Sequence, residues 1–299
     1  MLRLSPNATG ALLALAAFFV FSSHDALIKV LAATYSPVQI VFCIALFGFP
    51  LILAMVATDR AAGTLLPRNP AWVWVRGLTV AGSSVCGFYA FSVLPMAQVY
   101  AILFGTPLMI TLLSVPVLGE KVGWRRGLAV VVGMCGVLVV LRPGSAELSL
   151  GHLAALASAA MGAMTSVITR RIGQQERAAV LLLYAMAGNF VLMGAMMPWV
   201  YLPMPGPDLA VMIAIAAMAF AAMQLVILAY RRAEAVVVAP MQYSQIVWAV
   251  VFGTLFFQEQ PDAMTLLGAA IVIASGVYIV WREARRKVEG AGVDAGARL

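Results

Sequence analysis

Charged residues are scarce in this sequence. Only 10% of the 299 residues are Asp, Glu, Lys or Arg, whereas 63% are hydrophobic. A soluble globular domain is typically about a quarter charged. A water-soluble fold of this composition would have too little polar surface to cover its apolar residues. The composition therefore excludes a soluble enzyme or binding domain and predicts that most of the chain lies in lipid.

Cysteine and histidine are also rare. The three cysteines, Cys43, Cys86 and Cys135, fall inside apolar segments, and their odd number argues against a disulfide framework. The two histidines, His24 and His152, show no metal-ligand spacing. A membrane-embedded hydrolase or transferase would need clustered acids, histidines or nucleophiles. We therefore expect no catalytic residues, no metal and no cofactor.

The formal net charge is +7, but the basic residues are spread thinly over short gaps between apolar runs rather than gathered on one face. This distribution does not favour a nucleic-acid partner. When alternate gaps are compared, Lys29 and Arg142 fall on one side of the membrane and the rest of the 19 Lys and Arg residues on the other. Because cytoplasmic loops retain basic residues during insertion, both termini are predicted to be cytoplasmic, in a bacterial inner membrane.

Apolar runs bounded by charge, proline or glycine predict an all-α integral membrane protein with ten transmembrane helices. The predicted spans are 10–32, 36–57, 72–93, 96–117, 126–142, 149–169, 178–199, 208–229, 236–257 and 264–282. At about 1.5 Å per residue, runs of this length cross a hydrocarbon core of roughly 30 Å. The first run carries His24, Asp25 and Lys29 and lacks a small-x-small cleavage site, so we expect a retained span rather than a signal peptide.

An internal repeat relates the two halves of the sequence. Residues 90–120 align without a gap on residues 229–259, and each segment has an aromatic, a polar or proline-marked turn, a long apolar span and a final glutamate. Five spans, an odd number, separate equivalent positions, so the halves enter the membrane in opposite directions. We predict two inverted five-helix repeats, 1–143 and 148–284, around a central cavity, followed by a disordered cytoplasmic tail at 285–299.

The motifs along the chain resemble those of the drug/metabolite transporter superfamily, and within it the ten-helix EamA-type exporters. The resemblance covers essentially the whole chain and rests on Phe21 to Lys29, Gly119 to Lys121, Ala229 to Ala235 with Ala239 and Pro240, and Ala274 to Glu283. It looks closest to the YddG-type exporters of aromatic amino acids and methionine. The resemblance implies a basket-like bundle with a central cavity. This chain has Ile44 where many relatives carry an arginine in the second span, which puts a carboxylate anchor at that position in doubt.

Polar side chains inside the spans are candidates for function, because a charge at mid-helix costs roughly 2.5–3.5 kcal/mol on insertion scales. Asp25 and Lys29 are spaced to lie on one face of the first span, where they can pair. Asp25 is a candidate gate or contact for a substrate amine, with a structural pair as the equal alternative. Lys29, near the outer end of the span, is expected to be structural or topogenic. His24 is expected to be a satisfied donor, with proton coupling as the alternative.

The ninth predicted span carries a polar and aromatic stripe. Gln242, Gln245 and Trp248 recur on one side of this helix, and a lipid-facing glutamine would be costly. We expect the stripe to face the cavity, with helix packing as the alternative, and Pro240 to kink the helix. The remaining candidate substrate-binding residues are Tyr89, Gln98, Tyr100, Tyr184, Asn189, Gln224 and Tyr243. An interfacial aromatic belt is the competing interpretation for Tyr89 and Tyr100.

Glu120 and Glu259 close the two repeat segments, and we expect them to organise loops and helix packing rather than to touch substrate. Pro107 interrupts the fourth span, where we expect a hinge. Small-residue spacing is equally explained by packing within one bundle. We therefore expect a monomer or a weak dimer.

A cavity lined by tyrosine, tryptophan, methionine and neutral amides suits a small-molecule substrate with an apolar body and a few hydrogen-bonding groups. Neutral or aromatic amino acids and methionine fit this description. A zwitterion has no net charge, so its export down a concentration gradient needs no coupled ion. The sequence thus predicts a secondary transporter that exports small amphipathic metabolites by alternating access, without ion coupling. The alternatives are a proton-coupled drug or metabolite antiporter, a metabolite importer and, in a different class, a membrane channel.

Overall fold

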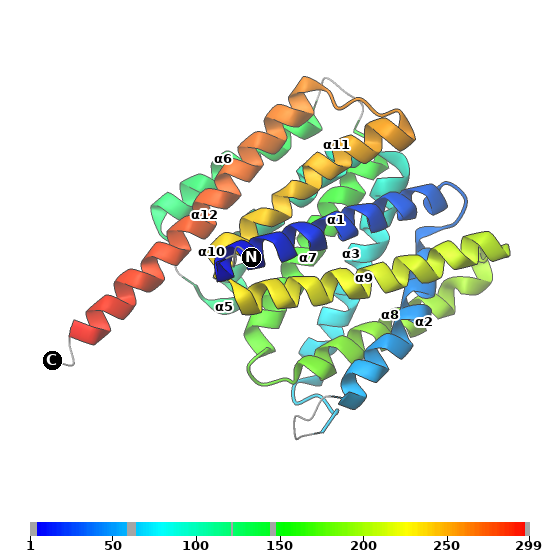
Figure 1. The fold of residues 1–299 in the computed structure, drawn as a ribbon, viewed down its shortest axis with the longest axis horizontal. Helices are drawn as coiled ribbons and strands as arrows, with labels where there is room; N and C mark the ends of the chain where they lie inside the picture. Colours follow the sequence, from blue (N-terminus) through cyan, green and yellow to red (C-terminus); the bar gives the residue numbers. More distant parts are fainter. Residues whose placement is uncertain (1–4, 59–63, 121, 144–147, 297–299) are drawn as a thin grey trace.

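The computed structural model describes residues 5–58, 64–120, 122–143 and 148–296, with side chains described as far as Arg282. The described residues form a bundle of helices (Figure 1). Several residues of the predicted basic side fall outside this description: Arg3, Arg60, Lys121 and Arg298 entirely, and Arg285, Arg286 and Lys287 in their side chains.

The fold is all α, as predicted. The first half contains α1 (Pro6–Ala32), α2 (Pro37–Thr58), α3 (Pro70–Val93), α4 (Met96–Leu103), α5 (Thr106–Leu118) and α6 (Trp124–Leu141). The second half contains α7 (Leu150–Ile172), α8 (Ala178–Val200), α9 (Gly206–Arg232), α10 (Ala235–Val238), the 3₁₀ helix η1 (Ala239–Tyr243), α11 (Ser244–Phe257) and α12 (Ala263–Gly296). Helix α4 continues into α5, and α10, η1 and α11 also form one segment.

Nine segments within the described residues are long and apolar enough to cross a membrane. The tenth predicted span corresponds to α3, which has 24 residues but is less apolar than the others because it carries Arg76 and several small polar residues. Helix α12 continues as a helix to Gly296 and projects beyond the bundle (Figure 1). For residues 285–296 this differs from the expected disorder, and a physical reason is that Glu, Ala, Arg and Lys, which follow the span, are strong helix formers. Residues 297–299 of the predicted tail lie outside the described residues.

The structure repeats the same helix end in both halves. Gly119 after α5 and Gln258 after α11 both have left-handed backbone conformations, with φ of 70° and 55°. The N–H of the next residue, Glu120 or Glu259, donates to a carbonyl in the preceding helix at 3.3 Å and 2.9 Å, respectively. Such ends satisfy carbonyls that the helix itself leaves unpaired. Because these positions coincide in the sequence alignment of the halves, the repeat extends to backbone geometry.

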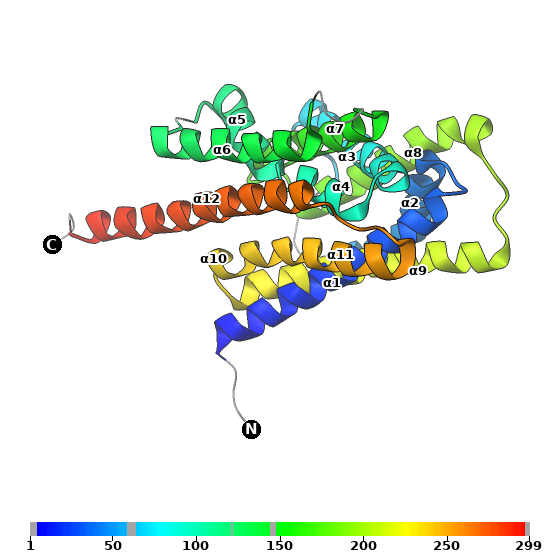
Figure 2. The same ribbon diagram turned by 90° about the horizontal axis from the view of Figure 1, so that it is seen from above.

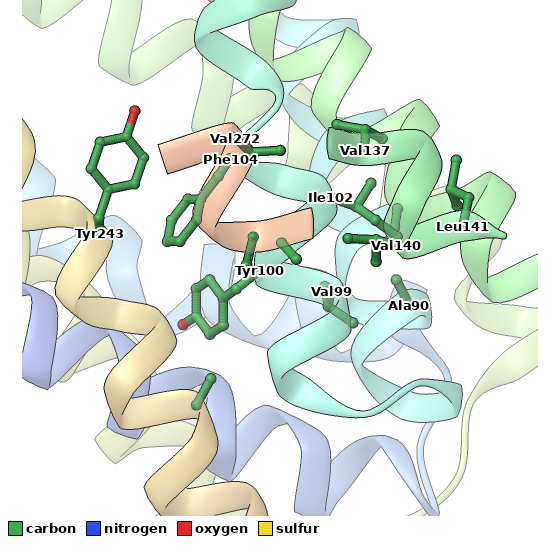
Figure 3. Packing of buried hydrophobic residues seen from close by; sticks show 14 of the residues in the cluster. Ala90, Val99, Tyr100, Ile102, Phe104, Val137, Val140, Leu141, Tyr243 and Val272 are labelled. Carbon is green, nitrogen blue, oxygen red and sulfur yellow. The ribbon is translucent and has the colours of Figure 1, made fainter. Parts of the chain in front are cut away.

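The fourth and ninth predicted spans are both interrupted in their first half. The first is broken at Phe104 and Gly105, just before Pro107, and the second is wound as a 3₁₀ helix around Pro240. Phe104 and Tyr243 occupy equivalent positions of the two halves, and their rings meet edge to face with centroids 5.0 Å apart (Figure 3). The two interrupted helices therefore face each other where the halves meet, as expected near an axis that relates inverted repeats.

The helices of one half pack mainly on those of the other. Helix α1 packs on α9, α3 packs on α7, α2 on α8, and α6 on α12. Figure 2 shows α1, α9, α10 and α11 on one side of the molecule and α3, α5, α6 and α7 on the other, with α2 and α8 together at one end. Exchanging the halves exchanges the α1–α9 pair with the α3–α7 pair. This packing confirms the predicted architecture of two inverted repeats.

The connection between α1 and α2 is tied to the second half. The Tyr35 hydroxyl donates to Asp208 Oδ2 at 2.6 Å, and this hydrogen bond raises the pKa of Tyr35 to about 12. The buried Gln39 side chain donates from Nε2 to the Leu202 carbonyl at 2.7 Å and accepts from the Leu202 N–H at 2.9 Å. These bonds fix the ends of α1, α2, α8 and α9 together at one face of the molecule.

The crossing of α6 and α12 depends on two glycines. A Cβ atom on Gly136 would lie 2.9 Å from the carbonyl oxygen of Gly268, so the two backbones are in contact. We expect Gly136→Ala to destabilise the protein by about 1–3 kcal/mol, the usual cost of overpacking. This loss is measured as a lower Tm of the detergent-solubilised protein. Gly127→Ala on the same helix, where no atom lies within 4 Å, is the control and keeps the wild-type Tm; equal Tm values for both variants would contradict the close crossing.

Candidate functional site

Asp25 on α1 is the centre of a polar network inside the bundle. The Tyr100 hydroxyl on α4 donates a hydrogen bond to Asp25 Oδ2, and His24 Nδ1 lies 2.9 Å from Asp25 Oδ1. The Tyr100 hydroxyl also lies 3.5 Å from Ser22 Oγ and 3.4 Å from Gln245 Nε2 on α11. These residues, hereafter the Asp25 network, join two helices of the first half to one of the second. Each polar group thereby has a partner at a depth where an unpartnered one is costly.

Aromatic packing holds Tyr100 in place. Its side chain is 3% exposed, and its ring lies against that of Phe91, with centroids 5.4 Å apart. The ring of Phe104 lies on it as well, with centroids 5.9 Å apart (Figure 3). Tyr100 is therefore a buried residue rather than a member of an interfacial belt. Helix α4 ends at Leu103. The rings of Tyr100 and Phe104 both point toward the helix segment that carries Tyr243 (Figure 3).

The polar stripe of the ninth span faces protein. Gln245 reaches Tyr100, and the Trp248 ring meets Phe19 of α1 edge to face at 4.8 Å. Val247, between them in sequence, points outward and is 58% exposed. Gln242 lies one turn earlier in η1 and is half-buried. The stripe thus lies along the contact between α11 and the first half.

Lys29 forms a buried ion pair with a residue of the opposite half. Lys29 Nζ lies 2.7 Å from Glu259 Oε1 and donates to the carbonyls of Phe91 at 3.0 Å and Leu94 at 2.6 Å. The two charged side chains are 11% and 16% exposed. We call this group the buried latch. The pair between Lys29 and Asp25 that their spacing allows is not formed, because the glutamate and two carbonyls already satisfy the ammonium group.

The opposite face carries an exposed counterpart. Arg170 near the end of α7 pairs with Glu120, and these side chains are 48% and 30% exposed. The adjacent Arg171 donates to the Val117 carbonyl, and its guanidinium lies 4.7 Å from the Trp72 ring centroid. We call the Arg170–Glu120 pair the exposed latch. Because Glu120 and Glu259 are equivalent in the repeat, the two latches are related by the exchange of the halves.

A cavity of about 200 Å³ lies between α2, α8 and α9. Its lining is apolar except for one amide, and includes Ile44, Gly48, Met186, Met223 and Gln224. Gln224 Nε2 approaches the sulfur of Met55 at 3.5 Å, a weak contact that leaves most of the amide's hydrogen-bonding capacity unused. Among the described residues that line this cavity none is basic, so a substrate carboxylate would meet no opposite charge here.

Three predicted site residues lie away from both the cavity and the Asp25 network. Gln98 Nε2 lies 3.1 Å from His152 Nε2, where α4 and α7 begin. Tyr184 packs against Trp74 with ring centroids 5.9 Å apart. Tyr243 points at α12, where a Cβ atom on Gly276 would lie 1.8 Å from its hydroxyl oxygen. Both tyrosine side chains thus contact neighbouring helices, and their role in substrate binding stays a prediction.

Two further predicted residues have polar groups inside the bundle. Asn189 lies at the middle of α8, and its buried Oδ1 has no hydrogen-bond partner among the described residues. Tyr89 is half-buried on α3, and its carbonyl accepts a hydrogen bond from Ser92 Oγ at 2.7 Å. Neither side chain takes part in the Asp25 network.

The pairing of Lys29 with Glu259 was missed by reasoning from the sequence. The two residues lie in opposite halves, and their spacing carries no periodic signal. A usable signal exists nevertheless: each half ends its fourth span with a glutamate and carries a basic residue near the end of its first helix. Ser22 was missed as well, because a serine one turn from Asp25 is common in membrane helices without a functional role.

Comparison with known proteins agrees with the repeat architecture. Residues 8–142 and 149–281 match the EamA-like transporter family. The chain is 28% identical over 274 residues to the pseudopaline exporter CntI of Pseudomonas aeruginosa, covering 91% of this chain and 95% of that protein. It is 24% identical over 262 residues to the S-adenosylmethionine uptake transporter of Rickettsia felis (88% and 89% covered) and 25% identical over 243 residues to the riboflavin transporter of Rhizobium johnstonii (81% and 80% covered). A solved crystal structure shares the fold with a TM-score of 0.64 at 19% identity, covering 94% of this chain and 99% of the other.

The two latches differ in burial and so in their expected effect on stability. Lys29→Met leaves the Glu259 charge buried and unpaired, which is expected to cost about 3–5 kcal/mol. The matched change at the exposed latch, Arg170→Met, is expected to cost no more than about 1 kcal/mol. Thermal unfolding of the solubilised variants measures both. Adding Glu259→Gln to Lys29→Met is expected to restore part of the lost Tm, and a double variant less stable than the single one would contradict the pairing.

Proposed function

The chain belongs to the EamA-like transporter family, and from that premise we propose that it exports small amphipathic metabolites by alternating access, with neutral or aromatic amino acids and methionine as its substrates. Members of this family and the relatives named above are transporters rather than enzymes. This chain is a multi-pass membrane protein that transports small molecules. Family membership leaves open the direction of transport and the substrate.

The observation that carries the proposal is the position of the cavity relative to the buried latch. The latch joins the ends of α1, α3 and α11 at the face where α1 ends and α2 begins. The cavity follows α2 from Ile44 to Met55, toward the face where α2 ends. A binding space displaced toward one face and sealed at the other is what one state of an alternating-access transporter requires.

The lining of the cavity supports an amphipathic substrate. Methionine, isoleucine and phenylalanine side chains present apolar surface, and Gln224 offers a single neutral amide. Methionine side chains adapt to irregular apolar bodies, whereas a few placed polar groups orient a ligand. Phenylalanine and methionine combine an apolar body with a compact polar end. Threonine has a smaller apolar body and is expected to be a poorer substrate.

The proposed mechanism needs no coupled ion. A zwitterion crosses the membrane potential without moving net charge, so its concentration gradient is a sufficient driving force. A rival mechanism, proton antiport, is favoured by one specific observation, the contact between His24 and Asp25 at 2.9 Å. Import is the rival direction, since relatives of this chain include an uptake transporter.

Purified protein in liposomes loaded with labelled phenylalanine, methionine or threonine tests this proposal. We expect phenylalanine and methionine to leave faster than from protein-free liposomes when no ion gradient is imposed, and threonine to leave more slowly. Efflux that requires an imposed proton gradient would rule out the uncoupled mechanism, and the absence of efflux for every amino acid would rule out the proposed substrates.

Orientation is a separate expectation. The bias of basic residues toward one set of loops supports cytoplasmic termini in a bacterial inner membrane, which would place the exposed latch at the cytoplasmic face. Reporter fusions active only in the cytoplasm are therefore expected to be active when attached after Leu299 and inactive when inserted after Gly206. The reverse result at either position would overturn the assigned direction of the helices.

A further inference from the structure

Asp25 has no lysine or arginine partner among the described side chains inside the bundle. Lys29 and Glu259 neutralise each other in the buried latch. Arg76, near the other end of the bundle, donates to Thr169 Oγ1 at 2.8 Å and to the Leu181 carbonyl at 2.9 Å. Asp25 has neutral or titratable donors as partners, and among the described side chains no lysine or arginine pairs with it. The carboxylate is thus held inside the membrane without a permanent positive partner.

The hydrogen bonds to Asp25 leave room for another donor. Tyr100 occupies Oδ2 and His24 occupies Oδ1, each with a single contact. An ionised carboxylate has about four acceptor positions on its two oxygens. The remaining positions suit a cationic donor, and a charged hydrogen bond is roughly twice as strong as a neutral one.

Aromatic rings pack against the hydrogen-bond partners of this carboxylate. Phe21 lies one turn before Asp25 on the same face of α1, and the Phe21 and Phe18 rings have centroids 6.4 Å apart. Phe91 lies against Tyr100 on the other side of the network. Aromatic faces attract organic cations as well as apolar groups. An ammonium or sulfonium group attached to an apolar body matches such surroundings.

The apolar cavity is linked to this network by shared packing. Ile44, which lines the cavity, and Phe88, whose ring centroid lies 6.4 Å from that of His24, pack against the same cluster of buried residues. The residues that line the cavity come from α2, α8 and α9, so Asp25 on α1 is linked to the cavity through this packing rather than by direct contact. Because Ile44 and its neighbours offer no positive charge, an anionic group is not favoured at the same place.

From these observations we propose that Asp25 is the substrate-binding residue that receives a cationic group, and that the protein prefers substrates in the order cation, zwitterion, anion. This inference rests on the proposed transport function and specifies its substrate class. Tyr100 and His24 hold the carboxylate in position, and Gln245 keeps the Tyr100 hydroxyl directed toward it. In an amino acid, the ammonium group occupies this position and the carboxylate is solvated by neutral amides or water.

Three probes with the same aromatic body separate the charge classes. 2-Phenylethylamine is a cation, phenylalanine a zwitterion and 3-phenylpropionate an anion. Binding to the purified protein, measured as the concentration that gives half of the maximal rise in Tm, is expected to be tightest for 2-phenylethylamine and absent for 3-phenylpropionate. Equal or tighter binding of 3-phenylpropionate to the wild-type protein would overturn the proposal without the use of any variant.

Substitution of Asp25 provides a second test of its role in binding. Asp25→Asn is expected to weaken binding of 2-phenylethylamine by about tenfold or more, which corresponds to the loss of one charged hydrogen bond. Asp25→Glu keeps the charge and is expected to retain part of the affinity. Asp262→Asn, which removes a carboxylate that pairs with Arg142 away from the cavity, is the matched control and keeps wild-type affinity. Unchanged 2-phenylethylamine affinity in Asp25→Asn would contradict the assigned role.

The binding measurements test the role of Asp25, and the transport measurements test the export function separately. If 2-phenylethylamine binds through Asp25 but no amino acid leaves loaded liposomes, the inference stands and the proposed export function is wrong. If phenylalanine is exported while the wild-type protein shows no preference among the three probes, the export function stands and the role of Asp25 is wrong. If Asp25→Asn abolishes only the pH dependence of phenylalanine export and leaves probe affinities unchanged, Asp25 carries a proton and the proposal is also wrong.

Discussion

Two glutamates connect the halves of this molecule, and the arrangement of the bundle follows from how each is neutralised. Glu120 and Glu259 follow the same left-handed helix end in the two repeats, and each meets a basic residue near the end of the other half's first helix. Exchanging the halves therefore exchanges the two ion pairs. Glu259 is buried, so leaving it unpaired would be costly, whereas Glu120 is partly exposed and depends less on its partner.

The two pairs are equivalent in sequence but not in environment. Lys29 and Glu259 are enclosed by protein and bound to backbone carbonyls, whereas Arg170 and Glu120 lie largely in the open. Helix packing has the same asymmetry: α1 lies against α3, but no comparable packing of α7 on α9 is found in the described part of the chain. The two halves of the inverted repeat therefore differ in packing at their equivalent ion pairs, and the enclosed pair lies at the face where α1 ends.

The helical architecture was accessible from the sequence because lipid imposes strong rules. Spanning length, the distribution of Lys and Arg, and the ungapped match of residues 90–120 to 229–259 were sufficient for the fold and the repeat. The arrangement of the candidate site was harder to predict from the sequence. Asp25, Tyr100 and Gln245 were expected to matter, but which helices bring them together depends on packing between halves, which no local periodicity encodes. For the same reason the contact of Tyr243 with α12 could not be predicted from the sequence.

The Asp25 network and the buried latch share their supporting helices. Asp25 and Lys29 lie one turn apart on α1, and Tyr100 and Met96 lie one turn apart on α4. The backbone N–H of Met96 donates to Glu259 Oε2 at 2.8 Å. One turn of helix is too stiff for its two ends to move independently. A change in the distance between Asp25 and Tyr100 therefore also displaces the groups that hold Glu259, so these two helical turns couple the Asp25 network to the buried latch.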